Sequence, residues 1–288
     1  MPFIAPTLMA LIIASVALCA PTVQQSLEDI DRSVADIRNI FINGRPKDCA
    51  DLYISGQNHS GVYNIFPYEG STQPVPAYCD MQSDGGGWTV FQRRGQFGNP
   101  VFYFYREWAA YAKGFGDPSK EYWLGNNVLH ALTSNKEMRL RIQLKNHTGE
   151  TLKADYSLFK VASEEELFKV KVSGYTGEQG ADSFSGTNEA AFTTHDQDHD
   201  THTANCAVTF KGVWPTGVRT TGAWWYTNCH SSNLNGLNLN GEHPTYADGI
   251  EWSHRNGTSG LHHYSYPEVE MKIRNVNFMT AITEGKIS

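Results

Sequence analysis

Basic residues are scarce in this sequence: 23 lysines and arginines stand against 30 aspartates and glutamates, and the formal net charge is −7. Between Val172 and Phe210 there is no lysine or arginine at all. Nucleic acids and anionic membranes select proteins with a basic face. The composition therefore argues against both as main partners and favours a neutral or cationic ligand.

Signature motifs of hydrolases are also absent. The sequence contains neither GxSxG nor HExxH, so its histidines and aspartates form no nucleophile or zinc-protease motif of those kinds. The cysteines are better explained as disulfide partners than as nucleophiles. We therefore expect no enzymatic activity.

Long apolar runs are absent after the first 20 residues. Residues 1–20 carry no charged side chain, are apolar from Leu8 to Leu18, and place small residues near Cys19 and Ala20. This pattern predicts a cleaved secretory signal. An uncleaved anchor is the alternative, because the run approaches the roughly 20 residues that span a bilayer. We expect a secreted, extracellular protein with no membrane insertion.

Without Cys19, an even number of cysteines remains, as in proteins of oxidising compartments. Three pairings are open. Sequential pairing would close two short loops, each contributing about 3.5 kcal/mol in the chain-entropy model. A four-cysteine zinc site is the alternative, although the spacing lacks a CxxC pair. Sequons at Asn58, Asn146 and Asn256 also fit a secreted glycoprotein. The four cysteines are Cys49, Cys79, Cys206 and Cys229.

Residues 21–45 carry an apolar repeat with spacings of 3, 4, 3 and 4, formed by Leu27, Ile30, Val34, Ile37 and Phe41. This a/d spacing predicts a short helix, and a helix of this length is marginal alone in water. We interpret it as a stalk through which residues 27–41 associate into a homo-oligomer. The alternative is an amphipathic helix packed on its own domain.

After Cys49 the sequence changes to short β-branched and aromatic runs broken by Gly, Asn and Pro, which predict an antiparallel sheet. Two segments have helical spacing. From Tyr175 to His263 there is little periodicity, and loops of that length are usually functional or ordered by a cation. The expected class is α+β. The strands are expected within 61–66, 85–94, 138–146, 167–175 and 268–275, and the helices within 106–116 and 126–135.

The segment DQDHDTHTANC, from Asp196 to Cys206, places aspartates at three alternate positions. Each pair repels by about 1 to 3 kcal/mol at a protein surface, so the segment is a solvated loop, holds a proton, or binds a cation. An EF-hand is excluded, because its sixth and twelfth positions would be Thr201 and Ala207. Alternating oxygen ligands favour Ca²⁺. A zinc or copper site would instead use His195, His199 and His202.

Several long motifs between Pro46 and Asn275 resemble the fibrinogen-related domain. They include SGVYNIFP, YCDMQSDGGGWTVFQRR, EYWLGNNVLHALT, GAWWYTNCHSSNLNG and YSYPEVEMKIR, in the order of that family. Within it, the chain is most similar to the techylectins and tachylectins. The ficolins are vertebrate relatives that differ by a collagen Gly-X-Y tract, which this sequence lacks. The resemblance implies a fibrinogen C-terminal-like domain over residues 46–288, with a small disulfide-closed N-terminal part, a central mixed sheet with helices, and a loop-rich C-terminal part.

The resemblance also implies a Ca²⁺ site in the acidic segment. The side chains of Asp198 and Asp200 and the carbonyls of His202 and Ala204 would be its ligands. Asp196 would then support the loop. Calcium would order the neighbouring ligand pocket and would not touch the ligand itself.

By the same resemblance, a pocket for acetyl groups lies beside the second disulfide, Cys206–Cys229, with a cis peptide bond between Asn228 and Cys229. Some relatives have Tyr where this chain has Phe210 and His262, so Phe210 keeps an apolar wall whereas His262 changes one contact. The neighbouring Trp224 and Trp225 are expected in the core. The expected pocket residues are Phe210, Asn228, Cys229, His230, Tyr246 and His262.

One segment, GVWPTGVRTT at 212–221, looks like an insertion relative to the family. It is a surface excursion, a specificity element or an artefact of the gene model. The resemblance implies a secreted, calcium-dependent lectin that recognises acetylated glycans such as N-acetylglucosamine on microbial surfaces in innate immunity. The alternative is a non-lectin receptor-binding or adhesion protein of the angiopoietin or fibrinogen-like type, because a fold does not fix a function.

Overall fold

The structure is a computed structural model that describes residues 23–28, 30–34, 44–209, 222–254 and 261–283. The chain divides into two compact units, which are Met1–Arg45 with Glu69–Thr72, and Pro46–Tyr68 with Gln73–Ser288. Several predicted features lie outside the described residues: the signal peptide at 1–20, Ile37 and Phe41 of the stalk, Phe210, the segment 212–221, and the sequon at Asn256.

In the first unit, residues 23–28 and 30–34 are helical. Leu27, Ile30 and Val34, the described members of the apolar repeat, are 53%, 57% and 57% exposed. One turn of this helix carries a hydrogen bond from Gln24 Nε2 to Glu28 Oε1 at 3.3 Å. The described part of the predicted stalk is thus a helix with exposed apolar side chains.

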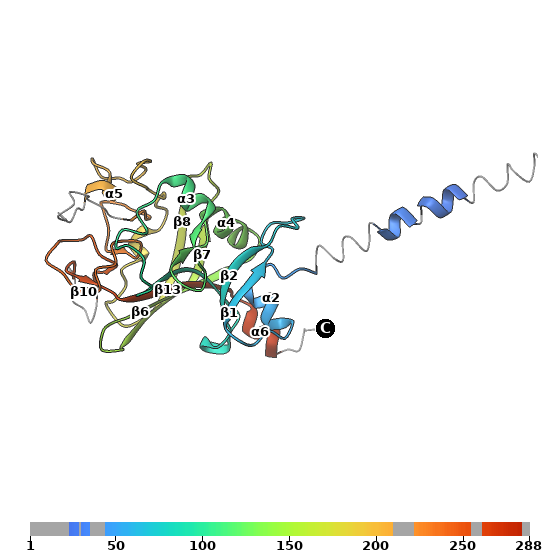
Figure 1. Cartoon of the computed structure of the whole chain (residues 1–288), viewed down its shortest axis with the longest axis horizontal. Helices are drawn as coiled ribbons and strands as arrows, with labels where there is room; N and C mark the ends of the chain where they lie inside the picture. Colours follow the sequence, from blue (N-terminus) through green and yellow to red (C-terminus); the bar gives the residue numbers. More distant parts are fainter. Residues whose placement is uncertain (1–22, 29, 35–43, 210–221, 255–260, 284–288) are drawn as a thin grey trace, which may run out of the picture. The chain divides into compact units, whose positions relative to one another are not determined.

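The second unit is built on a nine-stranded sheet with the order β1-β2-β3-β13-β6-β7-β8, in which β5 pairs with β3 and β4 (Figure 1). Its strand pairs are antiparallel. The long strands are β1 (Gly61–Ile65), β2 (Val75–Asp80), β3 (Trp88–Arg94), β6 (Met138–Lys145), β7 (Thr151–Val161), β8 (Val170–Gly177) and β13 (Glu268–Asn275). The short ones are β4 (Phe115–Gly116) and β5 (Tyr122–Trp123).

Short helices flank this sheet. Asp48 caps the first of them by accepting a hydrogen bond from the Asp51 N–H at 3.0 Å, and the disulfide Cys49–Cys79 links that helix to β2. In Figure 1, α3 and α4 lie beside β7 and β8. The described helices of this unit are α2 (Cys49–Ile54), α3 (Trp108–Lys113), α4 (Asn126–Ser134) and α6 (Phe278–Thr283), together with α5 (Cys206–Thr209), which lies in the loop-rich segment. The 3₁₀ turns are η1 (Ser83–Gly85) and η2 (Ser185–Thr187).

Between β8 and β13 the described residues, 178–209, 222–254 and 261–267, are mostly irregular. The described strands there contain two residues each and form two small sheets, β10 with β12 and β9 with β11. This segment lies at the end of the unit opposite β1 and α2 (Figure 1). The strands are β9 (Ser232–Asn233), β10 (Gly241–Glu242), β11 (Glu251–Trp252) and β12 (Tyr264–Ser265).

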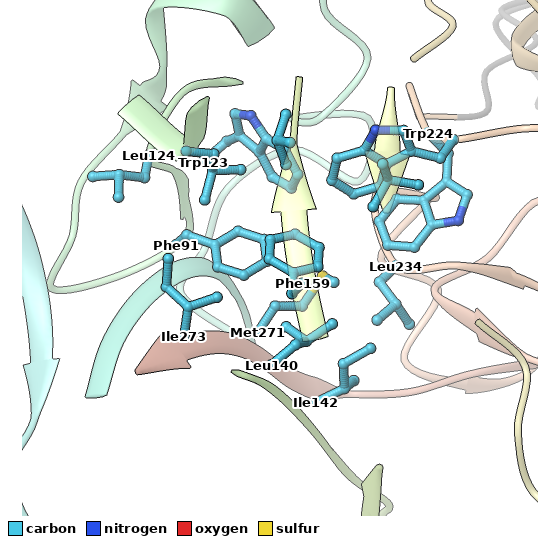
Figure 2. Close-up of a cluster of buried hydrophobic side chains, with 14 of the residues drawn as sticks. Phe91, Trp123, Leu124, Leu140, Ile142, Phe159, Trp224, Leu234, Met271 and Ile273 are labelled. Atoms are coloured by element: carbon cyan, nitrogen blue, oxygen red, sulfur yellow. The ribbon is translucent and has the colours of Figure 1, made fainter. Parts of the chain in front are cut away.

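One core joins the sheet to this loop-rich segment. Phe91 of β3 and Phe159 of β7 stack with ring centroids 5.6 Å apart, and Trp224 and Leu234 of the loop-rich segment belong to the same cluster (Figure 2). Trp224 and Trp225 are both 0% exposed, which confirms their predicted place in the core. Large aromatic anchors therefore hold an irregular segment that has little hydrogen-bonded sheet of its own.

The predicted α+β fold with its disulfide-closed N-terminal part is confirmed, and so are both predicted helices. Two strand starts were wrong. The strand expected from residue 85 begins at Trp88, because Gly85, Gly86 and Gly87 have positive φ values and lie in a turn. The strand expected from residue 167 begins at Val170, because Leu167 and Phe168 have φ values of 57° and 47° and form a turn. Both disulfides have the sequential pairing, Cys49 with Cys79 and Cys206 with Cys229.

Candidate functional site

In the acidic loop, the Asp200 carboxylate accepts two hydrogen bonds from the backbone. Its Oδ1 accepts a hydrogen bond from the His202 N–H at 2.9 Å, and its Oδ2 accepts one from the Cys206 N–H at 2.8 Å. Burial raises the pKa of Asp200; these two hydrogen bonds oppose the rise, and the nearby Asp198 carboxylate adds to it. A cation beside Asp198 and Asp200 would relieve the cost of keeping both ionised.

Asp196 has a different task in this loop. Its Oδ1 accepts hydrogen bonds from the Trp108 N–H at 3.0 Å and from Thr194 Oγ1 at 2.7 Å. Trp108 is the first residue of α3, so Asp196 ties the acidic loop to that helix. This geometry agrees with the supporting role expected for Asp196.

Other oxygen atoms of the loop that could bind a metal are the Ala204 carbonyl and the Asn205 side-chain amide oxygen. His202 Nδ1 lies 3.0 Å from the carbonyl oxygen of Ala204. The next residue, Asn205, donates from Nδ2 to the Thr194 carbonyl at 2.9 Å, while its Oδ1 is buried without a hydrogen-bond partner among the described residues. Carboxylates, backbone carbonyls and an amide oxygen are the ligands that Ca²⁺ prefers. The donor set therefore fits calcium.

The alternative transition-metal site in this loop is not supported. His195 stacks on Tyr105 with centroids 4.3 Å apart, and His199 packs edge-on against Trp108 at 5.3 Å. Neither belongs to a group of three potential metal donors among the described residues. His202 does lie in such a group, but with Cys206 and Cys229, whose sulfurs form a disulfide and are not thiolates.

The disulfide joins the acidic loop to the predicted pocket. Cys206 is the last residue of the acidic segment and is bonded to Cys229, and the Thr201 N–H donates to the Thr227 carbonyl at 3.2 Å. The Asn228–Cys229 peptide bond is cis, which confirms the expectation. Loop and pocket are therefore connected by a covalent bond and by backbone hydrogen bonding.

Three of the predicted pocket residues come together. The ring of His262 lies 5.9 Å from that of His230 and 5.1 Å from that of Tyr246. Tyr246 is 54% exposed, whereas the His230 side chain is almost fully buried. Asn228 is exposed and Cys229 is buried beside them. The structure thus places the exposed ring of Tyr246 against His262, and His262 against the buried His230.

Sequence reasoning missed Glu251. This residue is 0% exposed, and its Oε2 lies 2.7 Å from His262 Nδ1 and 3.8 Å from His230 Nε2. Burial alone would raise the pKa of Glu251, but the neighbouring imidazoles of His230 and His262 outweigh it and hold the pKa below its usual value. The sequence feature that could have indicated Glu251 is its position as a charged residue between the apolar Ile250 and Trp252.

A cavity of about 900 Å³ adjoins this group. His262 lines it, so the cavity and the predicted pocket share a wall. Trp252, Tyr264 and Tyr266 give it an aromatic lining, and residues 146–148, which form a sequon, lie at its edge. Asn146 Nδ2 donates to Glu150 Oε2 at 2.7 Å, whereas the sequon residue Asn58 is exposed. The cavity is large enough for a small ligand.

The family profile described as the C-terminal globular domain of fibrinogen beta and gamma chains matches residues 45–276. The chain belongs to this family. Techylectin-5A of Tachypleus tridentatus is 43% identical over 265 residues, which are 92% of this chain and 85% of techylectin-5A. Ryncolin-4 of Cerberus rynchops is 41% identical over 82% of this chain and 63% of its own length.

Among solved structures, the fibrinogen-like globe domain of human ANGPTL2 is similar, with a TM-score of 0.69 and 36% identity over 80% of this chain and 99% of that domain. Fibrinogen-like domains are non-enzymatic binding modules, which confirms the expectation that the chain is not an enzyme. Over the described residues, the helices are too short or too polar to span a bilayer.

Proposed function

We propose that this protein is a secreted, calcium-dependent lectin that recognises acetylated glycans. The observation that carries the proposal is the covalent connection between the acidic loop and the cluster of His230, Tyr246 and His262, through the disulfide Cys206–Cys229. Similarity to techylectin-5A, a protein named as a lectin, supports it.

The chemistry of the pocket suits an acetamido group. An aromatic surface such as that of Tyr246 accommodates a methyl group, and a few polar atoms orient its carbonyl and amide. The proposed pocket residues are Phe210, Asn228, Cys229, His230, Tyr246 and His262. N-acetylglucosamine-type sugars on microbial surfaces present this group, and an innate immune role follows from that ligand.

Calcium has an indirect role in this proposal. Asp198, Asp200 and the carbonyls of His202 and Ala204 would hold the ion, and the loop would transmit its order to Cys229 through the disulfide. Each acetyl pocket is small, so a single site binds weakly. Association through residues 27–41 would raise the apparent affinity by roughly 100- to 10,000-fold where the geometry permits.

The proposed chain organisation has three parts. Residues 1–20 would be the secretory signal and residues 21–45 the helical stalk, followed by the fibrinogen C-terminal-like domain over 46–288. Export of the chain would allow glycosylation at Asn58, Asn146 and Asn256.

The proposal is tested by retention on N-acetylglucosamine resin. The oligomeric, calcium-loaded protein should bind and should be eluted by acetate or by a chelator. Tyr246→Ala should abolish retention, because it removes the exposed ring of the pocket. Tyr68→Ala is the matched control, since it removes another exposed tyrosine, which is 38% accessible. Failure of the wild-type protein to bind contradicts the proposal.

Similarity to the ANGPTL2 globe domain favours a second candidate function, that of a receptor-binding or adhesion protein that binds no sugar. A glycan array with and without calcium separates the two. Two results together would favour the second candidate. The protein would bind no acetylated glycan in either condition, and it would bind a cell-surface protein with an affinity that Tyr246→Ala leaves unchanged.

A further inference from the structure

Four titratable side chains lie around Glu251. We call the group of five the Glu251 cluster: His230, His243, Asp248, Glu251 and His262. Glu251 and Asp248 are both 0% exposed. Their ion-pair partners among the described residues are histidines, with no lysine or arginine in reach. Two buried carboxylates therefore face imidazole rings, which are cationic only when protonated.

Each oxygen of Glu251 faces a different part of the cluster. Oε2 lies 2.7 Å from His262 Nδ1 and 3.8 Å from His230 Nε2. Oε1 lies 3.9 Å from His243 Nε2 and accepts a hydrogen bond from the Gly249 N–H at 3.3 Å. One ligand atom each from His230, Glu251 and His262 can be chosen so that all lie within 4.8 Å of one another.

Hydrogen bonding in the cluster is incomplete. His243 Nε2 and Asp248 Oδ2 are buried and have no hydrogen-bond partner among the described residues. Asp248 Oδ1 is held by Thr245 Oγ1 at 2.7 Å. Buried polar groups without partners are costly, and buried carboxylates without a compensating charge are more so. A divalent cation bound to Glu251 would place positive charge inside this cluster and so reduce the cost of burying both carboxylates.

We propose that His230, Glu251 and His262 bind a zinc ion. Two imidazoles and one carboxylate are an established zinc donor set, with the fourth position left to water or a ligand. With zinc–ligand bonds of about 2.0 to 2.1 Å, neighbouring ligand atoms of a tetrahedron stand roughly 3.3 Å apart. The observed separations of 2.7 and 3.8 Å bracket that value.

The surroundings of these three residues support the assignment. His243 and Gly249 face the Glu251 oxygen that points away from His262, which would fix the orientation of the ligating carboxylate. The His262 side chain is 13% exposed and lines the cavity of about 900 Å³, which gives an ion a route inward. This site uses none of the oxygen donors assigned to calcium.

The test is a zinc titration of the chelator-treated full chain in excess calcium, followed by calorimetry, with Co²⁺ as a spectroscopic probe of the same site. We expect one zinc ion per chain and visible Co²⁺ absorption bands typical of a tetrahedral site. Glu251→Gln should weaken zinc binding by more than the roughly 10- to 100-fold that loss of a supporting group costs. Circular dichroism reports whether each variant is folded.

His262→Ala is a second variant, because this partly exposed side chain can be removed with less disturbance of the core. It should also lose zinc. His147→Ala is the matched control, since His147 lines the same cavity but lies outside the cluster. Absence of zinc binding in the wild-type protein, or equal binding in the wild type and both cluster variants, overturns the proposal. The titration contains no glycan, so its outcome is separate from that of the resin experiment.

Discussion

Three aspartates with the same spacing have different surroundings in the acidic loop. Asp196 holds the loop to α3, Asp200 organises the backbone as far as Cys206, and Asp198 adds a second carboxylate near Asp200. Alternation along the sequence therefore does not make the three equivalent. The difference in their partners permits a matched comparison between neighbouring positions.

Asp198→Asn should abolish the rise in melting temperature on adding Ca²⁺, because it removes a proposed carboxylate ligand. In the wild type, calcium at 100 times its Kd should stabilise the fold by about 2.7 kcal/mol. Differential scanning calorimetry in calcium and in chelator measures the shift.

Asp196→Asn is the control for that experiment, since asparagine retains an Oδ1 acceptor for Trp108 and Thr194. It should keep the calcium response. Equal melting temperatures of the wild type in calcium and in chelator would remove the calcium assignment, and loss of the response in Asp196→Asn alone would reassign the ligands.

The buried pair of Asp80 and Lys272 predicts a pH dependence. Lys272 Nζ lies 2.6 Å from Asp80 Oδ2. Burial would raise the pKa of Asp80, but Lys272 and Ser83 outweigh it and lower the pKa. A carboxyl with a lowered pKa stabilises the fold above its unfolded value of about 4, and this stability is lost as the pH falls further.

Lys272→Met should therefore cost about 3 to 5 kcal/mol at neutral pH, because it leaves Asp80 without its partner. It should also flatten the loss of stability below about pH 4. Lys145→Met, which removes an exposed pair with Glu268 on the neighbouring strand, should cost less than about 1 kcal/mol. Urea denaturation across the pH range measures both. An unchanged acid slope in Lys272→Met would contradict the argument.

At the scale of elements, the stalk helix is where oligomerisation is expected. The double variant Ile30→Asp with Val34→Asp replaces two exposed apolar side chains of this helix by charged ones. Sedimentation should show an oligomer for the wild type and a monomer for the double variant, with the melting temperature of the globular domain unchanged. A monomer in both cases would reject the stalk. Gln24→Asp with Glu28→Asp, which changes polar positions of the same helix, should leave the oligomer intact.

The elements that the sequence predicted are those with a strong pattern over several residues. β13 and β6 are long, and α4 has an apolar face. The helix α2 was missed because its six residues are too few for a periodic pattern, and its start depends on the Asp48 cap. The strand β7 was also missed, although its sequence, TLKADYSLFKV, alternates between exposed and buried positions and could have predicted it.

At the scale of the whole molecule, contacts that belong to a family motif could be predicted, whereas contacts between separate segments could not. The disulfides and the cis bond before Cys229 followed from motifs that resemble a family. Glu251 did not, because its partners come from separate segments: His230, His243 and His262 meet it only after the loop-rich segment has packed on its aromatic core. Neither periodicity nor spacing carries that information.

The central place of β13 has a consequence for how the protein is made. Val269 of β13 pairs with Arg94 of β3 on one side and with Leu144 of β6 on the other. A nascent chain thus exposes the inner edges of β3 and β6 until residue 275 has left the ribosome. Open strand edges are templates for unwanted pairing, and such distant pairings form slowly. We therefore expect the protein to rely on chaperones during synthesis, and to close its main sheet only after nearly all of the domain has been translated.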